Sequence, residues 1–249
     1  MNFSIRVWRQ SSPKGRGRFE EYELNEISPD LSFMEMIDIL NNQLSNLKQD
    51  VIAYDHDCRE GICGACSLFI NGRAHGPDTE VTTCQLYMRM FKNGSTITIE
   101  PWRSRGFPII KDLVVDREAF DKILQAGGFV SIDTGSAPDA NTIQIAKVDA
   151  DNSLDASSCI GCGACVAACK NGSAMLFVAA RVSALAKLPQ GRIESAARAK
   201  AMVAKMDELG FGTCCNTGAC TNACPKKISI EHIARLNREF LLSNMVEKN

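Results

Sequence analysis

The sequence predicts an α+β protein in which a small mixed sheet with one crossing helix precedes a helical half. Apolar residues alternate with a period of two in several segments of the first hundred residues, which is typical of strands. Later apolar residues recur three and four apart, which is typical of helices. The chain has 249 residues, enough for one large or two smaller domains. Pro101 and Pro108 mark the change in composition, so we expect domains at 1–105 and 106–249.

Composition narrows the class of protein. Hydrophobic residues make up 45% of the chain and charged residues 23%, and the formal net charge is -1. These values are typical of globular proteins and argue against disorder or a strongly basic nucleic-acid-binding domain. Met1 to Gln10 lacks the apolar region of a signal peptide. Ala174 to Ala180 is the longest apolar stretch, so we expect no transmembrane helix.

The first half contains three strand signals and one helix signal. Ser4 to Gln10 alternates, Phe19 to Leu24 is a second extended run, and Ser95 to Glu100 is a third. Ser32 to Glu35 matches a capping box and precedes apolar residues at helical spacing, so a helix should begin there. The pattern therefore predicts a small mixed sheet crossed by a helix.

The second half contains three amphipathic segments, at Leu176 to Leu188, Ser195 to Leu209 and Ser229 to Leu242. Apolar residues recur in them three and four apart, which predicts helices. Gly127 to Ala140 contains Gly, Ser and Pro and is expected to be a loop.

The twelve cysteines fall into three groups of four. The first group is Cys58, Cys63, Cys66 and Cys84. Its first three members have the C-x4-C-x2-C spacing of a plant-type 2Fe-2S loop, whose fourth thiolate comes from further along the chain. Cys84 is the remaining cysteine of this half, so it is the expected fourth ligand. A four-cysteine zinc site is the alternative, although zinc sites favour paired C-x2-C spacing.

The second and third groups form an internal repeat, since six of eleven positions are identical between CIGCGACVAAC and CCNTGACTNAC. The spacing is the ferredoxin pattern for cubane clusters, in which the last cysteine of each run ligates the other cluster. The first cluster, a 4Fe-4S cubane, should therefore bind Cys159, Cys162, Cys165 and Cys224. The second should bind Cys169, Cys214 and Cys220.

The second cluster lacks one expected thiolate, because Thr217 occupies the position equivalent to Cys162. A hydroxyl is a poor iron ligand beside soft thiolates, so this cluster should be 3Fe-4S. Cys215 lies two residues from Thr217 and remains open as a fourth ligand. We expect it to be a free thiol next to the cluster, because it points away from its neighbour Cys214.

Other chemistry is sparse. The sequence has no G-x-G-x-x-G after a strand and no G-x-x-x-x-G-K-[ST], so we expect no bound nucleotide. The three histidines are far apart in the sequence and are expected to be structural. With clusters and no catalytic residue to assign, the chain is expected to accept and release single electrons.

Three motifs in order, DCREGICGAC, CIGCGACVAAC and CTNACPKKISI, resemble the iron-sulfur subunit of succinate dehydrogenase and fumarate reductase, the respiratory complex II family. CKNGSAMLF at Cys169 to Phe177 and NTGAC at Asn216 to Cys220 are similar to the bacterial branch of that family. FPIIKDLVVDREAFDKI at Phe107 to Ile123 is similar to the segment that joins the two domains in that family. The resemblance implies an N-terminal β-grasp ferredoxin domain of the plant type with a 2Fe-2S cluster. It also implies an all-helical two-cluster ferredoxin domain after it.

The resemblance also implies a function in the tricarboxylic acid cycle and the respiratory chain. A flavoprotein subunit with FAD would exchange electrons with the 2Fe-2S cluster. The 3Fe-4S cluster would face quinone at a membrane anchor subunit of the cytochrome b type. The chain would then lie on the cytoplasmic face of the bacterial inner membrane, held peripherally by the anchor. A cluster subunit of another flavoenzyme complex and a zinc-stabilised assembly scaffold are the alternatives.

Overall fold

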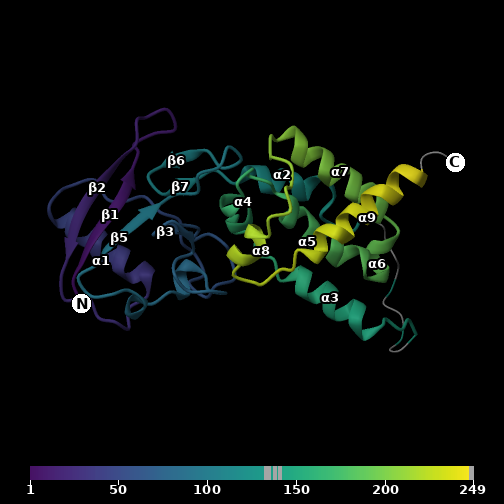
Figure 1. The fold of residues 1–249 in the computed structure, drawn as a ribbon, viewed down its shortest axis with the longest axis horizontal. Coiled ribbons are helices and arrows are strands. Elements are labelled where there is room, and N and C mark those ends of the chain that lie inside the picture. The colour runs from purple at the N-terminus through teal and green to yellow at the C-terminus, as the bar shows by residue number, and fades with distance from the viewer. Residues whose placement is uncertain (132–135, 137–138, 140–141, 247–249) are drawn as a thin grey trace.

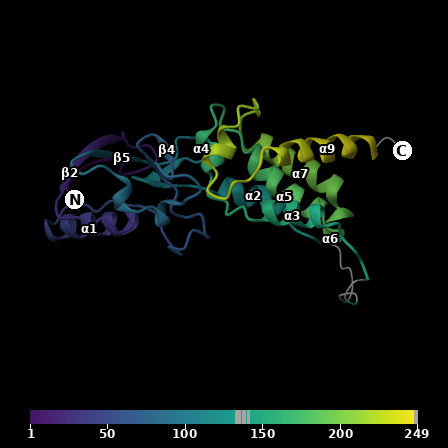
Figure 2. The same cartoon turned by 60° about the horizontal axis from the view of Figure 1, so that its bottom comes forward.

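The computed structural model describes residues 1–131, 136, 139 and 142–246. The molecule is elongated, with the sheet and the N-terminus at one end and the helices and the C-terminus at the other (Figure 1). A second view shows the same two-part arrangement (Figure 2). The expected loop at Gly127 to Ala140 lies partly outside the described residues.

The N-terminal part is built on a five-stranded sheet with the order β2-β1-β5-β3-β4. Strand β5 runs parallel to β1, and the other neighbours are antiparallel. The strands are β1 (Phe3–Arg9), β2 (Arg18–Leu24), β3 (Phe69–Ile70), β4 (Arg73–Ala74) and β5 (Thr96–Glu100). The three strands expected from alternation are confirmed. Strands β3 and β4 have two residues each, too few for an alternating pattern to show.

Helix α1 (Phe33–Asn46) begins where the capping box predicts. The Glu35 amide donates to Ser32 Oγ at 3.2 Å, and the Ser32 amide donates to Glu35 Oε2 at 2.7 Å. Its buried residues pack with the sheet into one core, which includes Phe33, Ile37 and Leu40. Two short 3-10 helices, η1 (Thr83–Gln85) and η2 (Met88–Met90), follow β4. The prediction of a small mixed sheet with one helix is therefore confirmed.

The helical part contains eight helices among the described residues. They are α2 (Glu118–Gly127), α3 (Lys147–Ser157), α4 (Ala164–Ala168), α5 (Met175–Ala186), α6 (Pro189–Arg192), α7 (Ser195–Glu208), α8 (Ala219–Ala223) and α9 (Glu231–Val246). Helix α5 is buried on almost all sides and packs against α3, α7 and α9. The three helices expected from periodicity correspond to α5, α7 and α9, so those predictions are confirmed.

The segment between the two parts packs on both cores. Trp102 and Phe107 lie in the helical core, whereas Leu113 lies in the sheet core. The hairpin of β6 (Ile109–Lys111) and β7 (Val114–Val115) carries Leu113. Asp112 at its turn accepts from the amides of Gln10 and Ala53, at 2.8 and 3.0 Å. The division at 105 and 106 stays a prediction, because the connecting segment contributes residues to both cores.

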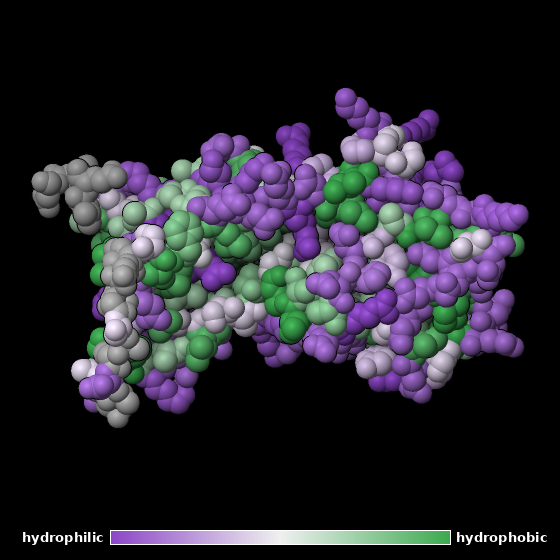
Figure 3. Space-filling model, turned by 180° about the vertical axis from the view of Figure 1, so that it is seen from behind, coloured by the Kyte–Doolittle hydropathy of each residue, from purple (hydrophilic) through white to green (hydrophobic). Residues whose placement is uncertain are grey.

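Several large apolar side chains are exposed on the helical part. Seen from behind, hydrophobic patches interrupt a largely hydrophilic surface (Figure 3). Among the described residues of the helical part, the side chains of Val148, Leu154, Ile193, Leu241 and Met245 are each more than half exposed. Across the described ranges, no helix has both the length and the apolar character needed to span a bilayer.

We predict that Ser32→Ala lowers the free energy of unfolding by about 1 kcal/mol, because it removes the N-cap acceptor of α1. Urea unfolding followed by circular dichroism measures this change. Ser45→Ala, on an exposed position of the same helix, is the control and should change stability little. Equal effects of the two substitutions would contradict the capping role.

Candidate metal centres

The first group of cysteines comes together beside α1. Cys66 and Cys84 are buried against Met34. Cys58 and Cys63 are half-buried. Cys63 lies close enough to Cys58 to influence the pKa of that thiol, and Cys84 and Cys63 lie close enough to Cys66 to raise its pKa. The structure therefore brings the four expected ligands of the 2Fe-2S cluster into one site.

Backbone conformation aims amide groups at these sulfur atoms. Gly61 and Gly64 both have a φ of +72°, and Arg59 is also left-handed with a φ of 55°. The Glu60 amide lies 3.3 Å from Cys58 Sγ, and the Ala65 amide lies 3.4 Å from Cys63 Sγ. N–H groups that point at sulfur stabilise its negative charge, which is the environment of a cluster thiolate.

The site has one buried edge and one edge near solvent. Burial, and then the neighbouring Cys84, raise the pKa of Cys66 to about 12. Hydrogen bonds from the backbone of Glu60 and Ile62 lower the pKa of Cys58 to about 7. Ile62 beside it is 60% exposed. A partner could therefore approach the centre at the edge formed by Cys58 and Ile62.

A network on α1 supports this loop, and sequence reasoning missed it. Asp38 accepts a hydrogen bond from the Tyr54 hydroxyl and pairs with Arg59 Nη1 at 2.8 Å. Tyr54 in turn packs against the cluster of Met34, Cys66 and Cys84. Asp38 is one acidic residue on a helix, and its sequence position gives no signal of this role.

Cysteines of the second and third groups gather in a cavity between α4 and the segment after α8, which we call the second centre. Its lining includes the four cysteines expected to bind the cubane, which are Cys159, Cys162, Cys165 and Cys224. Burial raises the pKa of Cys162 to about 12, and burial followed by the nearby Cys162 raises the pKa of Cys165 well above its usual range. Thiols buried side by side become thiolates when a cationic metal centre supplies the opposite charge.

A separate cavity, which we call the third centre, contains the remaining cysteines of these two groups. Cys169, Cys214 and Cys220 lie around it together with Thr217 and Cys215. Cys215 is exposed, whereas the other three cysteines are half-buried. Thr217, which aligns with Cys162 in the sequence repeat, therefore lines the cavity of the third centre.

The internal repeat is visible in the backbone. Gly163 and Gly218 precede α4 and α8 with φ angles of 83° and 73°. Gly161 and Asn216 occupy equivalent positions and are also left-handed, with φ angles of 63° and 54°. Asparagine is one of the few residues with a side chain that adopts this conformation readily. Helices α4 and α8 pack together, so each run supplies its last cysteine to the neighbouring cavity.

The residues present fit iron-sulfur clusters. All twelve cysteines are free thiols, and thiolates are the usual ligands of such clusters. Amide groups of the loops point at several of the sulfur atoms, including Asn216 N at 3.4 Å from Cys214 Sγ. Within the described ranges, no three His, Cys, Asp or Glu side chains converge closely enough to hold a single metal ion.

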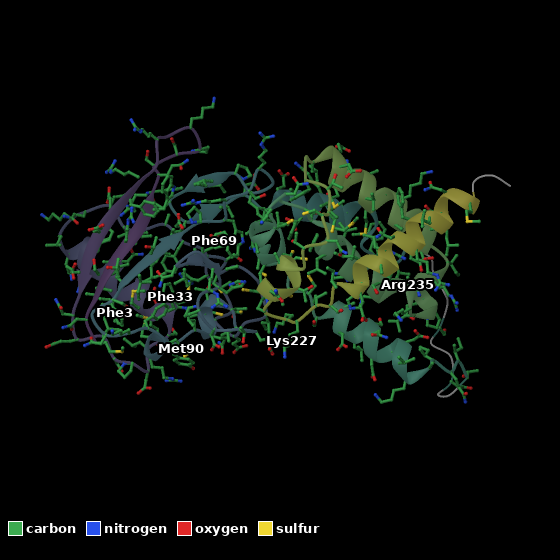
Figure 4. The ribbon with its side chains drawn as sticks, in the orientation of Figure 1. Phe3, Phe33, Phe69, Met90, Lys227 and Arg235 are labelled. Atoms are coloured by element: carbon green, nitrogen blue, oxygen red, sulfur yellow. The ribbon has the colours of Figure 1, made fainter. Side chains whose placement is uncertain are left out.

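The first two centres are in direct contact. A Cβ atom on Gly64 would lie 2.3 Å from the carbonyl oxygen of Ile160, so only glycine permits this approach. At the same junction Phe69, labelled in Figure 4, packs edge to face on Trp102 with ring centroids 4.9 Å apart. Lys227, also labelled, pairs with Glu80 at 2.6 Å across the two parts.

His75 is a buried histidine at this junction. Its Nδ1 accepts from the Thr83 amide at 3.3 Å, and its ring lies edge to face with Trp102. Its Nε2 has no hydrogen-bond partner among the described residues. The other two histidines, His56 and His232, lie apart from it, and neither lines a cysteine cavity. The packing of His75 is that of a structural residue, and the structural role of the other two histidines stays a prediction.

Comparison with known proteins agrees with this geometry. Residues 4–122 match the family model of a 2Fe-2S iron-sulfur cluster binding domain, and residues 158–228 match that of a 4Fe-4S dicluster domain. The chain is thus an iron-sulfur protein with one domain of each kind.

Relatives of similar sequence indicate the family of iron-sulfur proteins. The succinate dehydrogenase iron-sulfur subunit of Bacillus subtilis is 27% identical, with 94% of this chain and 90% of the relative covered. The fumarate reductase iron-sulfur subunit of Wolinella succinogenes is also 27% identical, with 97% and 98% covered. The chain belongs to the family of iron-sulfur subunits of succinate dehydrogenase and fumarate reductase.

A solved structure shows the same fold. It is a chain of the Mycobacterium smegmatis Sdh1 complex in the apo form, with a TM-score of 0.67 and 23% identity. The match covers 96% of this chain and 97% of that chain. The expected architecture, a 2Fe-2S domain with a small sheet followed by a helical dicluster domain, is therefore confirmed.

His75 makes stability depend on pH. Burial lowers its pKa to about 4 in the folded chain, while an unfolded histidine titrates near 6.5. The unfolded state therefore binds more protons between these values, and stability falls as the pH is lowered through this window. From pH 7 to pH 5 we expect a loss of about 2 kcal/mol from this group.

Urea unfolding at several pH values, under anaerobic conditions, measures this loss. His75→Gln should flatten the pH dependence, whereas His56→Gln, at an exposed position, should leave it unchanged. The same slope in the wild type and in His75→Gln would show that another group is responsible.

Proposed function

We propose that this chain is the electron-transfer subunit of a succinate:quinone oxidoreductase, either a succinate dehydrogenase or a fumarate reductase. It relays single electrons between the flavin of a partner subunit and quinone at a membrane anchor. The main support is that three thiol centres follow one another through direct contacts. The first touches the second at Gly64 and Ile160, and α4 and α8 join the second to the third.

Each centre has a proposed cluster. Cys58, Cys63, Cys66 and Cys84 would hold the 2Fe-2S cluster, and Cys159, Cys162, Cys165 and Cys224 the 4Fe-4S cluster. Cys169, Cys214 and Cys220 would hold a 3Fe-4S cluster beside Thr217. Such clusters supply one-electron chemistry when bound. The chain itself supplies thiolates, amide groups directed at sulfur and burial that excludes water.

Exposure supports the order of transfer. The first centre has its accessible edge at Cys58 and Ile62, where a flavoprotein with FAD could approach. The third centre has the exposed Cys215 at its rim, where an anchor subunit of the cytochrome b type could bind. A relay is needed because flavin and quinone exchange two electrons whereas a cluster carries one. Attachment to the anchor would place the chain on the cytoplasmic face of the inner membrane.

The complex purified anaerobically from its native host tests this function. We expect the chain to copurify with a succinate-oxidising flavoprotein, and succinate to reduce its clusters in the assembled complex. Copurification with a different flavoenzyme would assign the chain to another complex, and a colourless chain that contains zinc and no iron would contradict the redox function.

In the proposed arrangement, the last cysteine of each run ligates the cluster that the other run mainly binds. Cys224→Ala should remove the 4Fe-4S signal, although Cys224 belongs to the same run as ligands of the other centre. Cys215→Ser is the control and should leave all clusters in place. Electron paramagnetic resonance and iron analysis measure both outcomes, with about nine iron atoms expected in the wild type. Retention of the 4Fe-4S signal in Cys224→Ala would contradict the assignment of Cys224 to that cluster.

Thr217→Cys should convert the 3Fe-4S centre to 4Fe-4S, because a thiolate then completes the fourth corner. The reduction potential should fall, since the new ligand adds negative charge. Redox titration followed by electron paramagnetic resonance measures both changes, and Thr217→Ser is the matched control. A 3Fe-4S resonance that persists unchanged in Thr217→Cys would show that Thr217 does not face the missing corner.

A further inference from the structure

Three carbonyl groups from two cysteine loops converge at the junction of the domains. Gly64 contributes one from the first loop, and Gly161 and Cys162 contribute two from the second. Carbonyl oxygens only accept hydrogen bonds, so they cannot bond to one another. Buried carbonyls from two loops can therefore lie together only if donors are placed between them.

Ser67, Trp102 and Arg117 are those donors. The Ser67 hydroxyl lies 2.7 Å from the Gly64 oxygen and 2.8 Å from the Cys162 oxygen, and its one proton is shared between them. Trp102 Nε1 donates to the Cys162 oxygen at 2.9 Å. Arg117 Nη1 donates to the Gly64 oxygen and lies 3.4 Å from the Gly161 oxygen.

This contact lies directly between two sets of proposed ligands. Gly64 stands between Cys63 and Cys66 in the sequence, and Cys162 is itself a thiol of the second centre. A Cβ on Gly64 would also lie 3.0 Å from the Cys162 amide nitrogen. The backbones of the two loops are therefore in van der Waals contact at Gly64, and Ser67 bridges the two loops there.

We propose that Ser67 is a positioning residue that fixes the separation of the 2Fe-2S and 4Fe-4S centres, and with it the rate of electron exchange between them. One electron leaves one centre and enters the other, so the step needs no proton and no further reactant. The proposal rests on the proposed function insofar as both clusters must be present.

Ser67 is the most informative of the three donors to change. It is 5% exposed and carries no charge, so its removal alters spacing without adding an electrostatic effect. The Arg117 charge acts on Cys162 directly, since it favours the thiolate of that residue. Trp102 fills the helical core, and its loss would leave a cavity.

The test compares variants of the full chain that carry their clusters. Ser67→Ala removes the hydroxyl, and Ser67→Thr restores one. Ser153→Ala is the matched control, because Ser153 is equally buried and donates to the Ala184 oxygen at 2.7 Å, joining α3 to α5 away from the junction. Microwave power saturation of the reduced 2Fe-2S signal reports its magnetic coupling to the reduced 4Fe-4S cluster. Hydrogen exchange of the segments 60–68 and 158–166 reports the contact itself.

We expect Ser67→Ala to retain its iron but to lose magnetic coupling, with the 2Fe-2S signal saturating at lower power. Exchange in the two segments should accelerate about fivefold, the factor that corresponds to loss of about 1 kcal/mol. Ser67→Thr should restore both values, and Ser153→Ala should change neither.

Coupling and exchange in Ser67→Ala that match those of the wild type would overturn the proposal while leaving the relay in place. Loss of iron from Ser67→Ala would also overturn it, because Ser67 would then be needed for cluster binding and not for spacing. Absence of iron from the wild-type chain would instead refute the proposed function. Trp102→Phe, which removes the second donor to Cys162 together with part of the ring that fills the helical core, should weaken the coupling in the same direction.

Discussion

The structure depends on the way that two short helices share their cysteines between two cavities. Helix α4 carries Cys165 toward one cavity and ends before Cys169, which faces the other. Helix α8 carries Cys220 toward the cavity that contains Cys169, and it ends before Cys224, which lines the cavity that contains Cys165. Cysteines of both runs line each cavity, so each proposed centre requires the two runs to pack together. Both helices have five residues, and left-handed residues precede both.

The sheet domain is joined to this helical pair by interactions of different kinds. Side chains of the connecting segment pack in both cores, so the two domains share their packing. At the centre of the junction, donors from Ser67, Trp102 and Arg117 hold together carbonyls that would otherwise be unsatisfied. The junction is therefore both a packing interface and a place where the loops of two candidate redox centres touch. Any change in the angle between the domains would alter the contact at Gly64.

Local patterns predicted much of this arrangement. The capping box located α1, and alternation located β1, β2 and β5. Cysteine spacing, together with the repeat, predicted that Cys224 would join the second centre, and the structure places it there, although ligation itself stays a prediction. These features were accessible because each depends on residues that are close together in the sequence or on a motif whose chemistry is general.

Other features depend on contacts that no local pattern encodes. Ser67 and Cys162 are separated by 95 positions in the chain, and Trp102 and Cys162 by 60. A serine beside a cysteine loop gives no sign of a partner so distant. The apolar periodicity of α1 predicts which face of the helix is buried. It does not predict the contacts of Asp38, which lies on the polar face. The hairpin β6–β7 follows two prolines that suggested a boundary, but its apolar Leu113 returns to the sheet core.

The central claim is that three different clusters occupy the three cysteine centres of one chain. Native mass spectrometry of the anaerobically purified full chain tests it most directly, because each cluster type adds a distinct mass. The account predicts a single holo species that carries one 2Fe-2S, one 4Fe-4S and one 3Fe-4S cluster. A holo species that carries zinc, or one with two 4Fe-4S clusters in the wild-type chain, would contradict it.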